Sequence, residues 1–238
     1  MSGLAERVGA EHASVSAQLP TQVVSSVRRA AALQRFVALG LPHIRDDQWR
    51  YANLRPVERA TFVSANGTAA HDPLNLALPA ALPGIPRLIF VNGHYAAAMS
   101  SPEALPPGAR ILPLASAGGE HTGEIVTAEF SADERFAWLN EAFAEDGVLL
   151  QISGHASIEL LFLTHSVSPT TAPPAASYPR LQVLLRPGAQ LCLIERHLGG
   201  AGPHGLIDAT TQLKLESGAR CTHYRLQGCE HDALFLDS

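Results

Sequence analysis

The sequence predicts a helical and mixed α+β region over residues 1–147, followed by an all-β part over residues 148–238. The main observation is a phrase that occurs twice, with its Gly-Ala pair beginning at Gly188 and again, 30 residues later, at Gly218. Each copy is typical of a strand, a tight turn and a second strand, in which side chains alternate between two faces. Such a unit cannot bury its apolar face alone, so the copies must stack as the rungs of a β-solenoid.

The composition excludes several classes of protein. A net charge of −5 with 16% charged residues leaves no basic surface for nucleic acid. The three cysteines lack the dense spacing of a disulfide framework, which indicates a reducing compartment. Residues 1–19 lack the apolar segment of a signal peptide, and no apolar run approaches the roughly 20 residues that span a bilayer. We therefore expect a soluble, cytoplasmic protein that contacts neither nucleic acid nor membrane.

Residues 21–39 are predicted to form the first long helix, because their apolar residues recur at steps of three and four. Gly40 is expected to end this helix. Arg28, Arg29 and Arg35 are expected on its solvated side. The predicted apolar face consists of Val23, Val27, Ala30, Leu33 and Val37.

Two aromatic residues and a hairpin signal follow. Trp49 and Tyr51 are expected to pin the helix to a small core, with ligand stacking as the alternative. Leu88–Val91 is predicted to be a strand that turns at Asn92-Gly93, a strong hairpin signal. Tyr95–Met99 would return along it, and Arg110–Leu114 would form another short strand.

A second helix is predicted just before the β part. Ser131 and Glu134 have the spacing of a capping box. Gly147 would end the helix as its left-handed C-cap residue. The predicted buried face of this helix carries Phe136, Leu139 and Phe143. The strands predicted after it are Val148–Ile152, Ile158–Leu163, Arg180–Leu185, Gln190–Glu195, Ile207–Leu215, Cys221–Leu226 and Ala233–Leu236, with a loop over Ser166–Ser177.

Two Cys-x-His pairs are the sharpest candidate for chemistry. They are Cys221 with His223 and Cys229 with His231, each at strand spacing i, i+2, and both residue types bind zinc or iron. Two arguments oppose a metal site. No Cys-x2–4-Cys spacing is present, and the repeat aligns the first pair with leucines at apolar positions. We therefore favour a small buried Cys and a hydrogen-bonded His, with a metal-binding domain as the alternative.

Other titratable residues do not predict an enzyme. Glu195 and His197 have acid–base spacing, but a surface pair is the simpler interpretation. Cys192 faces away from its leucine neighbours and is expected to be structural, since free cysteines are usually buried. The adjacent Glu145 and Asp146 are expected to be solvated at a helix end. No phosphate-binding Gly-rich loop is present.

A β-helix enzyme acting on carbohydrate is the alternative function, and it would need paired carboxylates. The acidic residues of the β part do not recur at the repeat spacing, so no such pair is predicted. These residues are Glu159, Glu195, Asp208, Glu216 and Glu230. We therefore predict no catalytic site.

The strand predicted at Ala233–Leu236 is followed by no cap. An uncapped solenoid exposes an apolar edge that invites aggregation. We expect either that the natural protein continues or that a partner covers this end.

Several motifs, taken in order, resemble the SufD family of iron–sulfur cluster assembly proteins, within the SufB/SufD superfamily. They are Asp47–Tyr51, Phe90–Tyr95, Leu139–Gly147, Pro179–Leu181, Gly188–Leu191 with Glu195, and Gly218–Ala219 with His223–Gln227. SufB shares the architecture and is the nearest alternative within the superfamily.

The resemblance implies a helical N-terminal region, a right-handed parallel β-helix and a C-terminal helical domain. It also implies a scaffold subunit that pairs with a SufB-like subunit through the β-helix and binds a SufC-like ATPase through the C-terminal domain. The iron–sulfur cluster would be handled by the assembled complex. The sequence stops inside the predicted β-helix, so the incomplete fold lacks that C-terminal domain. No catalytic, cofactor-binding or metal residue is carried over from the family.

Overall fold

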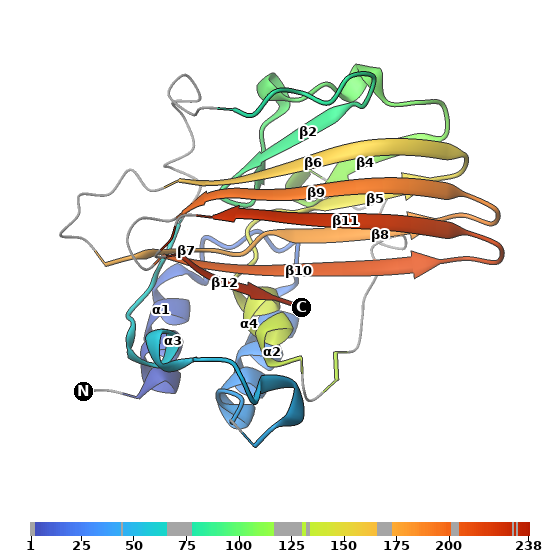
Figure 1. Cartoon of the computed structure of the whole chain (residues 1–238). Coiled ribbons are helices and arrows are strands. Elements are labelled where there is room, and N and C mark those ends of the chain that lie inside the picture. The colour runs from blue at the N-terminus through green and yellow to red at the C-terminus, as the bar shows by residue number, and fades with distance from the viewer. Residues whose placement is uncertain are drawn as a thin grey trace.

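The fold consists of two packed β-sheets with α-helices on one side (Figure 1). A computed structural model describes residues 3–43, 45–65, 78–116, 130–131, 134–165, 173–200, 205–229, 231 and 233–238. The α-helices are α1 (Leu4–Val15), α2 (Ser26–Leu39), α3 (Arg55–Arg59) and α4 (Arg135–Phe143). Short 3₁₀ turns are η1 (Asp47–Trp49), η4 (Ala97–Met99), η5 (Pro102–Ala104) and η6 (Leu114–Ser116). None of the helices described is long and apolar enough to cross a bilayer.

Both sheets are mixed. The first sheet has the order β1-β7-β10-β8-β5-β4, with β12 also paired to β10; the second has the order β11-β9-β6-β2-β3. Strands of the first sheet are β1 (Val63–Ser64), β4 (Ala109–Pro113), β5 (Val148–Ile152), β7 (Ala175–Ser177), β8 (Arg180–Leu185), β10 (Leu206–Leu215) and β12 (Leu234–Asp237). Those of the second are β2 (Arg87–Val91), β3 (His94–Tyr95), β6 (His155–His165), β9 (Gln190–Gly200) and β11 (Arg220–Cys229). Among the described strands, β2 with β3 and β4 with β5 pair antiparallel, and the other pairings are parallel.

The predicted repeat is confirmed by the strand register. From β8 to β12 the chain alternates between the two sheets, and β9 lies parallel to β11 with Gln190 opposite Arg220, a step of 30 residues. The turns that precede β9 and β11 also stack, with the Gly188 amide donating to the Ser217 carbonyl at 2.9 Å. Gly188 and Gly218 have φ of 73° and 71°, a conformation that glycine adopts without steric cost.

The main core lies between the two sheets. Its buried members include Ile158, Val183 and Leu193, whose side chains point inward from β6, β8 and β9. On β10 the same inward positions hold Leu213 and Leu215, which are 42% and 45% exposed. They are exposed because no strand covers them within the described part of the chain.

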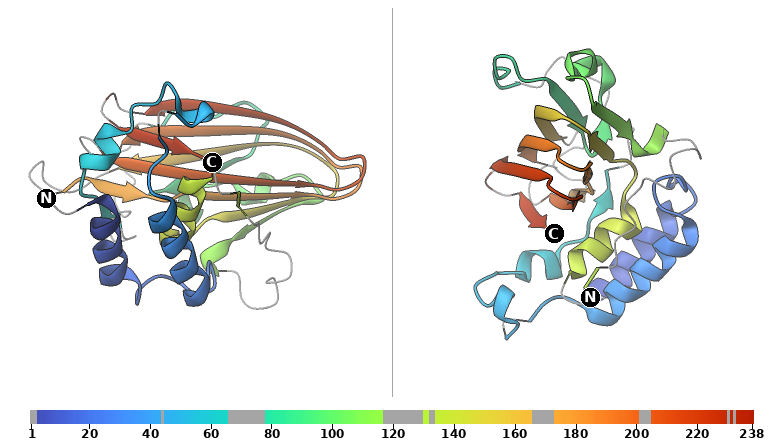
Figure 2. Two further views of the ribbon diagram at one scale, coloured as in Figure 1. Left: turned by 90° about the horizontal axis from the view of Figure 1, so that it is seen from below. Right: turned by 90° about the vertical axis from the view of Figure 1, so that its right-hand side faces the viewer.

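The helices pack on the outer face of the first sheet through a second apolar cluster (Figure 2). The predicted face of α4 is confirmed, since Phe136, Leu139 and Phe143 are all buried there. The predicted N-cap was wrong, because Glu134 and not Ser131 is the N-cap of α4, which begins at Arg135. Of the predicted capping box only one hydrogen bond forms, in which the Glu134 carboxylate accepts from the Ser131 amide at 2.5 Å.

Gly147 does not have the predicted left-handed conformation. The C-cap of α4 is Ala144, and a Cβ on Gly147 would lie 2.5 Å from the Arg180 carbonyl oxygen. Glycine is therefore required here by the close approach of β8 and not by its own φ.

The prediction for α2 was wrong about the residue at which the helix begins and about which of its faces is buried. The helix begins at Ser26, after Ser25 caps it by accepting from the Arg28 amide at 3.3 Å. Val27 is 83% exposed, whereas Arg29 is 2% exposed. The Arg29 guanidinium is buried because it donates to four backbone carbonyls. These belong to Pro20, Val24, Ala142 and Ala144.

The aromatic prediction was half right. The half-buried Trp49 ring packs edge-on against Phe136, with ring centroids 5.2 Å apart, whereas Tyr51 is 94% exposed. The hairpin is confirmed, since β2 and β3 pair antiparallel around Asn92 and Gly93, both at positive φ. Its return strand is only two residues long and passes into η4.

The predicted loop over Ser166–Ser177 was partly wrong. Its residues 166–172 lie outside the described residues, but Ala175–Ser177 forms β7 and pairs with both β1 and β10.

Candidate functional site

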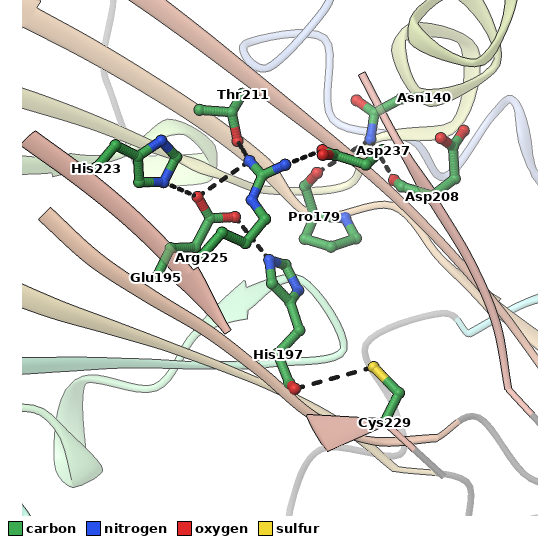
Figure 3. Close-up of polar contacts among 10 residues, drawn as sticks. All are labelled: Asn140, Pro179, Glu195, His197, Asp208, Thr211, His223, Arg225, Cys229 and Asp237. Atoms are coloured by element: carbon green, nitrogen blue, oxygen red, sulfur yellow. Dashed lines mark hydrogen bonds and ion pairs between the residues drawn. The ribbon is translucent and has the colours of Figure 1, made fainter. Parts of the chain in front are cut away.

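A polar cluster interrupts the apolar core between the sheets, and we call it the Glu195 network (Figure 3). On β9 the first inward positions hold the apolar Leu191 and Leu193. The next two inward positions hold Glu195 and His197, and these two polar residues are each 1% exposed. A buried carboxylate is costly unless it is paired and hydrogen-bonded. The members of the network are Glu195, His197, Thr211, His223, Arg225 and Asp237.

Both oxygens of Glu195 have hydrogen-bond partners. Oε1 lies 2.6 Å from His197 Nε2, and Oε2 lies 2.7 Å from His223 Nε2. Arg225 Nη2 donates to Oε2 at 3.1 Å. The repeat produces this contact, because Glu195 and Arg225 are direct neighbours in the parallel register of β9 and β11.

Arg225 extends the network to the first sheet. It donates to Thr211 Oγ1 on β10 at 2.5 Å and forms an ion pair with Asp237 on β12. His197 is held between the rings of Phe162 and Phe235, with centroids 4.8 and 4.9 Å away. The network therefore joins β9, β10, β11 and β12.

The Glu195 carboxylate stays ionised. Burial alone would raise its pKa, but hydrogen bonds from His197 and His223 and the charge of Arg225 hold the pKa far below the usual range. A carboxylate that is ionised and fully hydrogen-bonded is poorly suited to exchange protons with a substrate near neutral pH. The network is thus better suited to tie strands together than to perform acid–base chemistry.

The predicted surface pair of Glu195 and His197 is wrong in location. The pair forms, but in the interior, because the repeat places it on the inward face of β9. Arg225, Thr211 and Asp237 were not among the predicted site residues. The 30-residue step of the repeat contained the signal for Arg225, since it aligns that residue with Glu195.

The Cys-x-His candidates are not brought together. Cys221 and Cys229 are eight residues apart on the single strand β11, about 26 Å at the usual rise per residue. Cys221 packs against the main core, and Cys229 Sγ lies 3.9 Å from the His197 carbonyl. His223 is bonded to Glu195, and His231 is exposed beyond the strand.

Within the described residues no group of three or more His, Cys, Asp or Glu side chains is placed to hold a metal. Burial, together with the nearby Cys192, raises the pKa of the Cys221 thiol, which disfavours the thiolate form that binds metals. Cys192 is half-exposed on the outer face of the second sheet, which is the face opposite to its leucine neighbours, as predicted. It borders a groove of about 560 Å³ with its register neighbours Ser157 and Thr222.

Two acidic residues of the β part, Glu159 and Glu216, each pair with a different arginine. Glu159 pairs with Arg87 at 2.7 Å, and Glu216 pairs with Arg186 at 3.4 Å. Glu230 lies outside the described residues. In the strand register, Glu159 is opposite Ile194 and not opposite another acid. The described part of the chain therefore gives no support to a carboxylate pair for carbohydrate chemistry.

Glu145 and Asp146 are not solvated, contrary to prediction. Asp146 is 6% exposed and accepts from the Tyr95 amide at 3.1 Å. Glu145 accepts from Ser64 Oγ at 2.9 Å and contacts His94 Nε2 at 3.0 Å. The two residues join the β2–β3 hairpin, β1 and the end of α4, and we call these contacts the Glu145–Asp146 junction. Burial alone would lower the pKa of His94, but the hydrogen bond and charge of Glu145 raise it above its usual value.

Asp208 of β10 and Asn140 of α4 lie on the side of β10 that faces the helices, opposite to the Glu195 network (Figure 3). Asn140 Nδ2 donates to the carbonyls of Pro179 and Asp208, at 3.0 and 2.7 Å. The Asp208 carboxyl is fully buried, and neither of its oxygens has a hydrogen-bond partner among the residues that the structure describes. Burial and the nearby Asp237 raise its pKa well above the usual aspartate value.

The hairpin and the Glu145–Asp146 junction both lie in a segment that a family model recognises. The model of the SufBD protein N-terminal region matches residues 10–161, more than half of the chain. The chain belongs to the SufBD family. An iron–sulfur cluster assembly SufBD family protein of Synechocystis sp. is 28% identical over an alignment of 230 residues, covering 88% of this chain. The chain spans about half the length of that relative, 49%.

Proposed function

We propose that this chain belongs to a non-enzymatic scaffold subunit of a SUF-type iron–sulfur cluster assembly complex, of the SufD type. The observation that carries the proposal is the SufBD family match over residues 10–161. The relative from Synechocystis sp. supports it, because that protein is described as an iron–sulfur cluster assembly protein. The Glu195 network supports a structural role, since its carboxylate accepts hydrogen bonds that join neighbouring strands.

We also propose that strands β5 to β12 are successive turns of a right-handed parallel β-helix. The parallel registers and the 30-residue step of β8–β10 and β9–β11 support this architecture. The right hand follows from the strong preference of parallel strand–crossover–strand connections for that sense.

The proposed partner at the β-helix is a SufB-like subunit. Strand β11 stands at the edge of the second sheet, with β9 on one side and no strand on the other among the described residues. Its outward side chains Tyr224 and Leu226 are 56% and 48% exposed. An edge with unpaired backbone groups and exposed apolar side chains is suited to pair with another chain.

The proposal for the whole protein includes two further functions. A SufC-like ATPase would bind a C-terminal helical domain of the longer protein. The cluster would be cargo that the assembled complex handles.

The test is co-purification of the full-length protein with SufB-like and SufC-like proteins from the same genome. A tagged SufB-like protein should retain it, and a Tyr224→Lys/Leu226→Lys double variant should bind at least tenfold more weakly. Val27→Lys, at an exposed position on α2, is the matched control and should bind normally. Recovery of the protein without partners under every condition would rule out the scaffold function. Normal binding by the double variant would rule out the edge of β11 as the surface that contacts the SufB-like subunit.

A further inference from the structure

Strand β12 is held on β10 by four register pairs, and a different acidic residue lies on each face of this contact. Asp208 on β10 is opposite Leu236, and Asp237 on β12 is opposite Ala209. Asp237 points into the space between the sheets, where it pairs with Arg225. Asp208 points to the opposite side, toward α4 (Figure 3). Leu206, Leu236 and Leu139 belong to the apolar cluster on that side.

The two acids differ in their partners. Asp237 pairs with the Arg225 cation, whereas neither oxygen of the fully buried Asp208 has a hydrogen-bond partner in the described part of the chain. The amide of Asn140 does not serve this carboxyl, because it donates to the main-chain carbonyls of Asp208 and Pro179. A buried carboxyl without donors is far more stable protonated than ionised.

Among the described residues, no cation forms an ion pair with Asp208 that would compensate its ionised form. On β8, Arg180 Nη2 pairs with Glu141 of α4 at 3.5 Å, and its Nη1 makes no hydrogen bond within the residues described, so it does not reach the Asp208 carboxyl. Arg135 of α4 pairs with Asp46 at 3.2 Å. Lys214, on β10 itself, is exposed six residues along the strand. Of the remaining titratable neighbours, Asp237 would repel the charge, and Tyr178 is a buried phenol whose pKa the charge of Asp208 helps to raise.

We propose that Asp208 is a proton-controlled latch for β12. When the Asp208 carboxyl is protonated, β12 and α4 pack against β10. Ionisation of this carboxyl favours the release of β12 from β10. Release would expose the edge of β10 over Leu206–Ala209 and the apolar side chains that Leu234 and Leu236 contact. An exposed strand edge can accept another strand, so the latch would make this edge available at higher pH. The latch consists of residues of this chain alone and is independent of the proposed function.

The direction of the pH effect follows from proton linkage. The closed state binds the Asp208 proton more tightly than the open state, where the residue has an ordinary aspartate pKa of 3.8. Each opening event therefore releases a proton between that value and the higher pKa of the closed state. Across this range the opening constant should rise about tenfold per pH unit and then level off.

The experiment is amide hydrogen exchange of β12, measured from pH 4.5 to 9 and corrected at each pH for the intrinsic exchange rate. The informative amides include Leu234 and Ser238, which donate to the carbonyls of Gly205 and Ala209. We expect their opening constant to rise with pH in the wild type. In Asp208→Asn it should stay flat and close to the low-pH wild-type value.

Asp237→Asn is the matched control, because it removes an acid from the same strand contact on the other face. It should raise the opening constant at every pH by losing the Arg225 ion pair, while keeping the pH slope. Amides of β6 should stay protected in all three proteins and show that the fold is intact. If Asp208→Asn fails this check, the ¹³C carboxyl titration of Asp208 in the wild type decides instead. An ordinary aspartate pKa in that titration, a wild-type β12 without pH slope, or an unchanged slope in Asp208→Asn would overturn the latch.

Discussion

Replacing Glu195 by Gln tests whether the Glu195 network holds the last strands together. The change keeps the size of the side chain but removes the charge and one acceptor oxygen. Three charge-assisted hydrogen bonds, at 2.6, 2.7 and 3.1 Å, converge on the wild-type carboxylate. Each such bond contributes roughly 1.5–3 kcal/mol, and breaking a buried ionic pair from one side costs about 3–5 kcal/mol. Since Gln retains one acceptor, we expect a loss of about 2–4 kcal/mol.

The assay is urea unfolding, with calorimetry as a second measurement. At roughly 2–4 °C per kcal/mol for a chain of this size, a loss of about 3 kcal/mol lowers Tm by roughly 6–12 °C. Glu216→Gln is the control, because the side chains of Glu216 and Arg186 are 29% and 40% exposed. An exposed pair of this kind contributes less than about 1 kcal/mol.

The pH dependence adds a second criterion. Because the folded pKa of Glu195 is lowered, its stabilisation is fully present above the unfolded value of 4.5 and is lost as pH falls below it. The difference between wild type and Glu195→Gln should therefore shrink in acid. A Gln variant within about 0.5 kcal/mol of wild type at pH 7, the range of ordinary surface substitutions, would refute the reasoning.

Three further predictions concern separate parts of the molecule. Gly147→Ala should lower the free energy of unfolding by about 1–3 kcal/mol, because the new Cβ would meet a carbonyl oxygen of β8. Gly9→Ala, in open space on α1, should instead raise it by up to about 1 kcal/mol. Urea unfolding measures both changes, and changes of the same sign would contradict the reasoning. The pKa of His94, measured by NMR, should lie above 6.5. The stabilisation that His94 provides should be full below pH 6.5 and lost as pH rises through its folded pKa, and His94→Gln should remove this pH dependence. A measured pKa at or below 6.5 would count against the Glu145–Asp146 junction. A Cys221→Ala/Cys229→Ala double variant purified without oxygen should contain as much metal as wild type by elemental analysis, because the two thiols lie about 26 Å apart along one strand; lost metal would contradict this placement.

Patterns within a short stretch of sequence predicted much of the β part. The extents of β5 and β8 and the hairpin at Asn92-Gly93 followed from runs of apolar residues and from turn chemistry. The 30-residue repeat predicted the pairing of β9 with β11, since stacked units of equal length place equivalent residues side by side. It also placed Arg225 beside Glu195, although this consequence of the repeat was missed.

The errors fell where a distant segment decides whether a side chain is buried. Arg29 has the composition of a solvated helix face, yet carbonyls from the end of α4 make burial favourable for its guanidinium. Glu145 and Asp146 have the composition of a surface helix end, yet the hairpin and β1 supply their donors. Helical periodicity gives the spacing of a face but not its direction, which explains the exposed Val27.

The sequence by itself determined the period of the strands, their turns and the residues that share a face, because these depend on neighbours a few positions away. Only the tertiary structure decided which polar side chains are buried. Their burial is favourable only when partners from other strands satisfy them, as in the Glu195 network. Asp208 shows the converse, since a fully buried carboxyl without donors can be recognised only once every neighbour has its place.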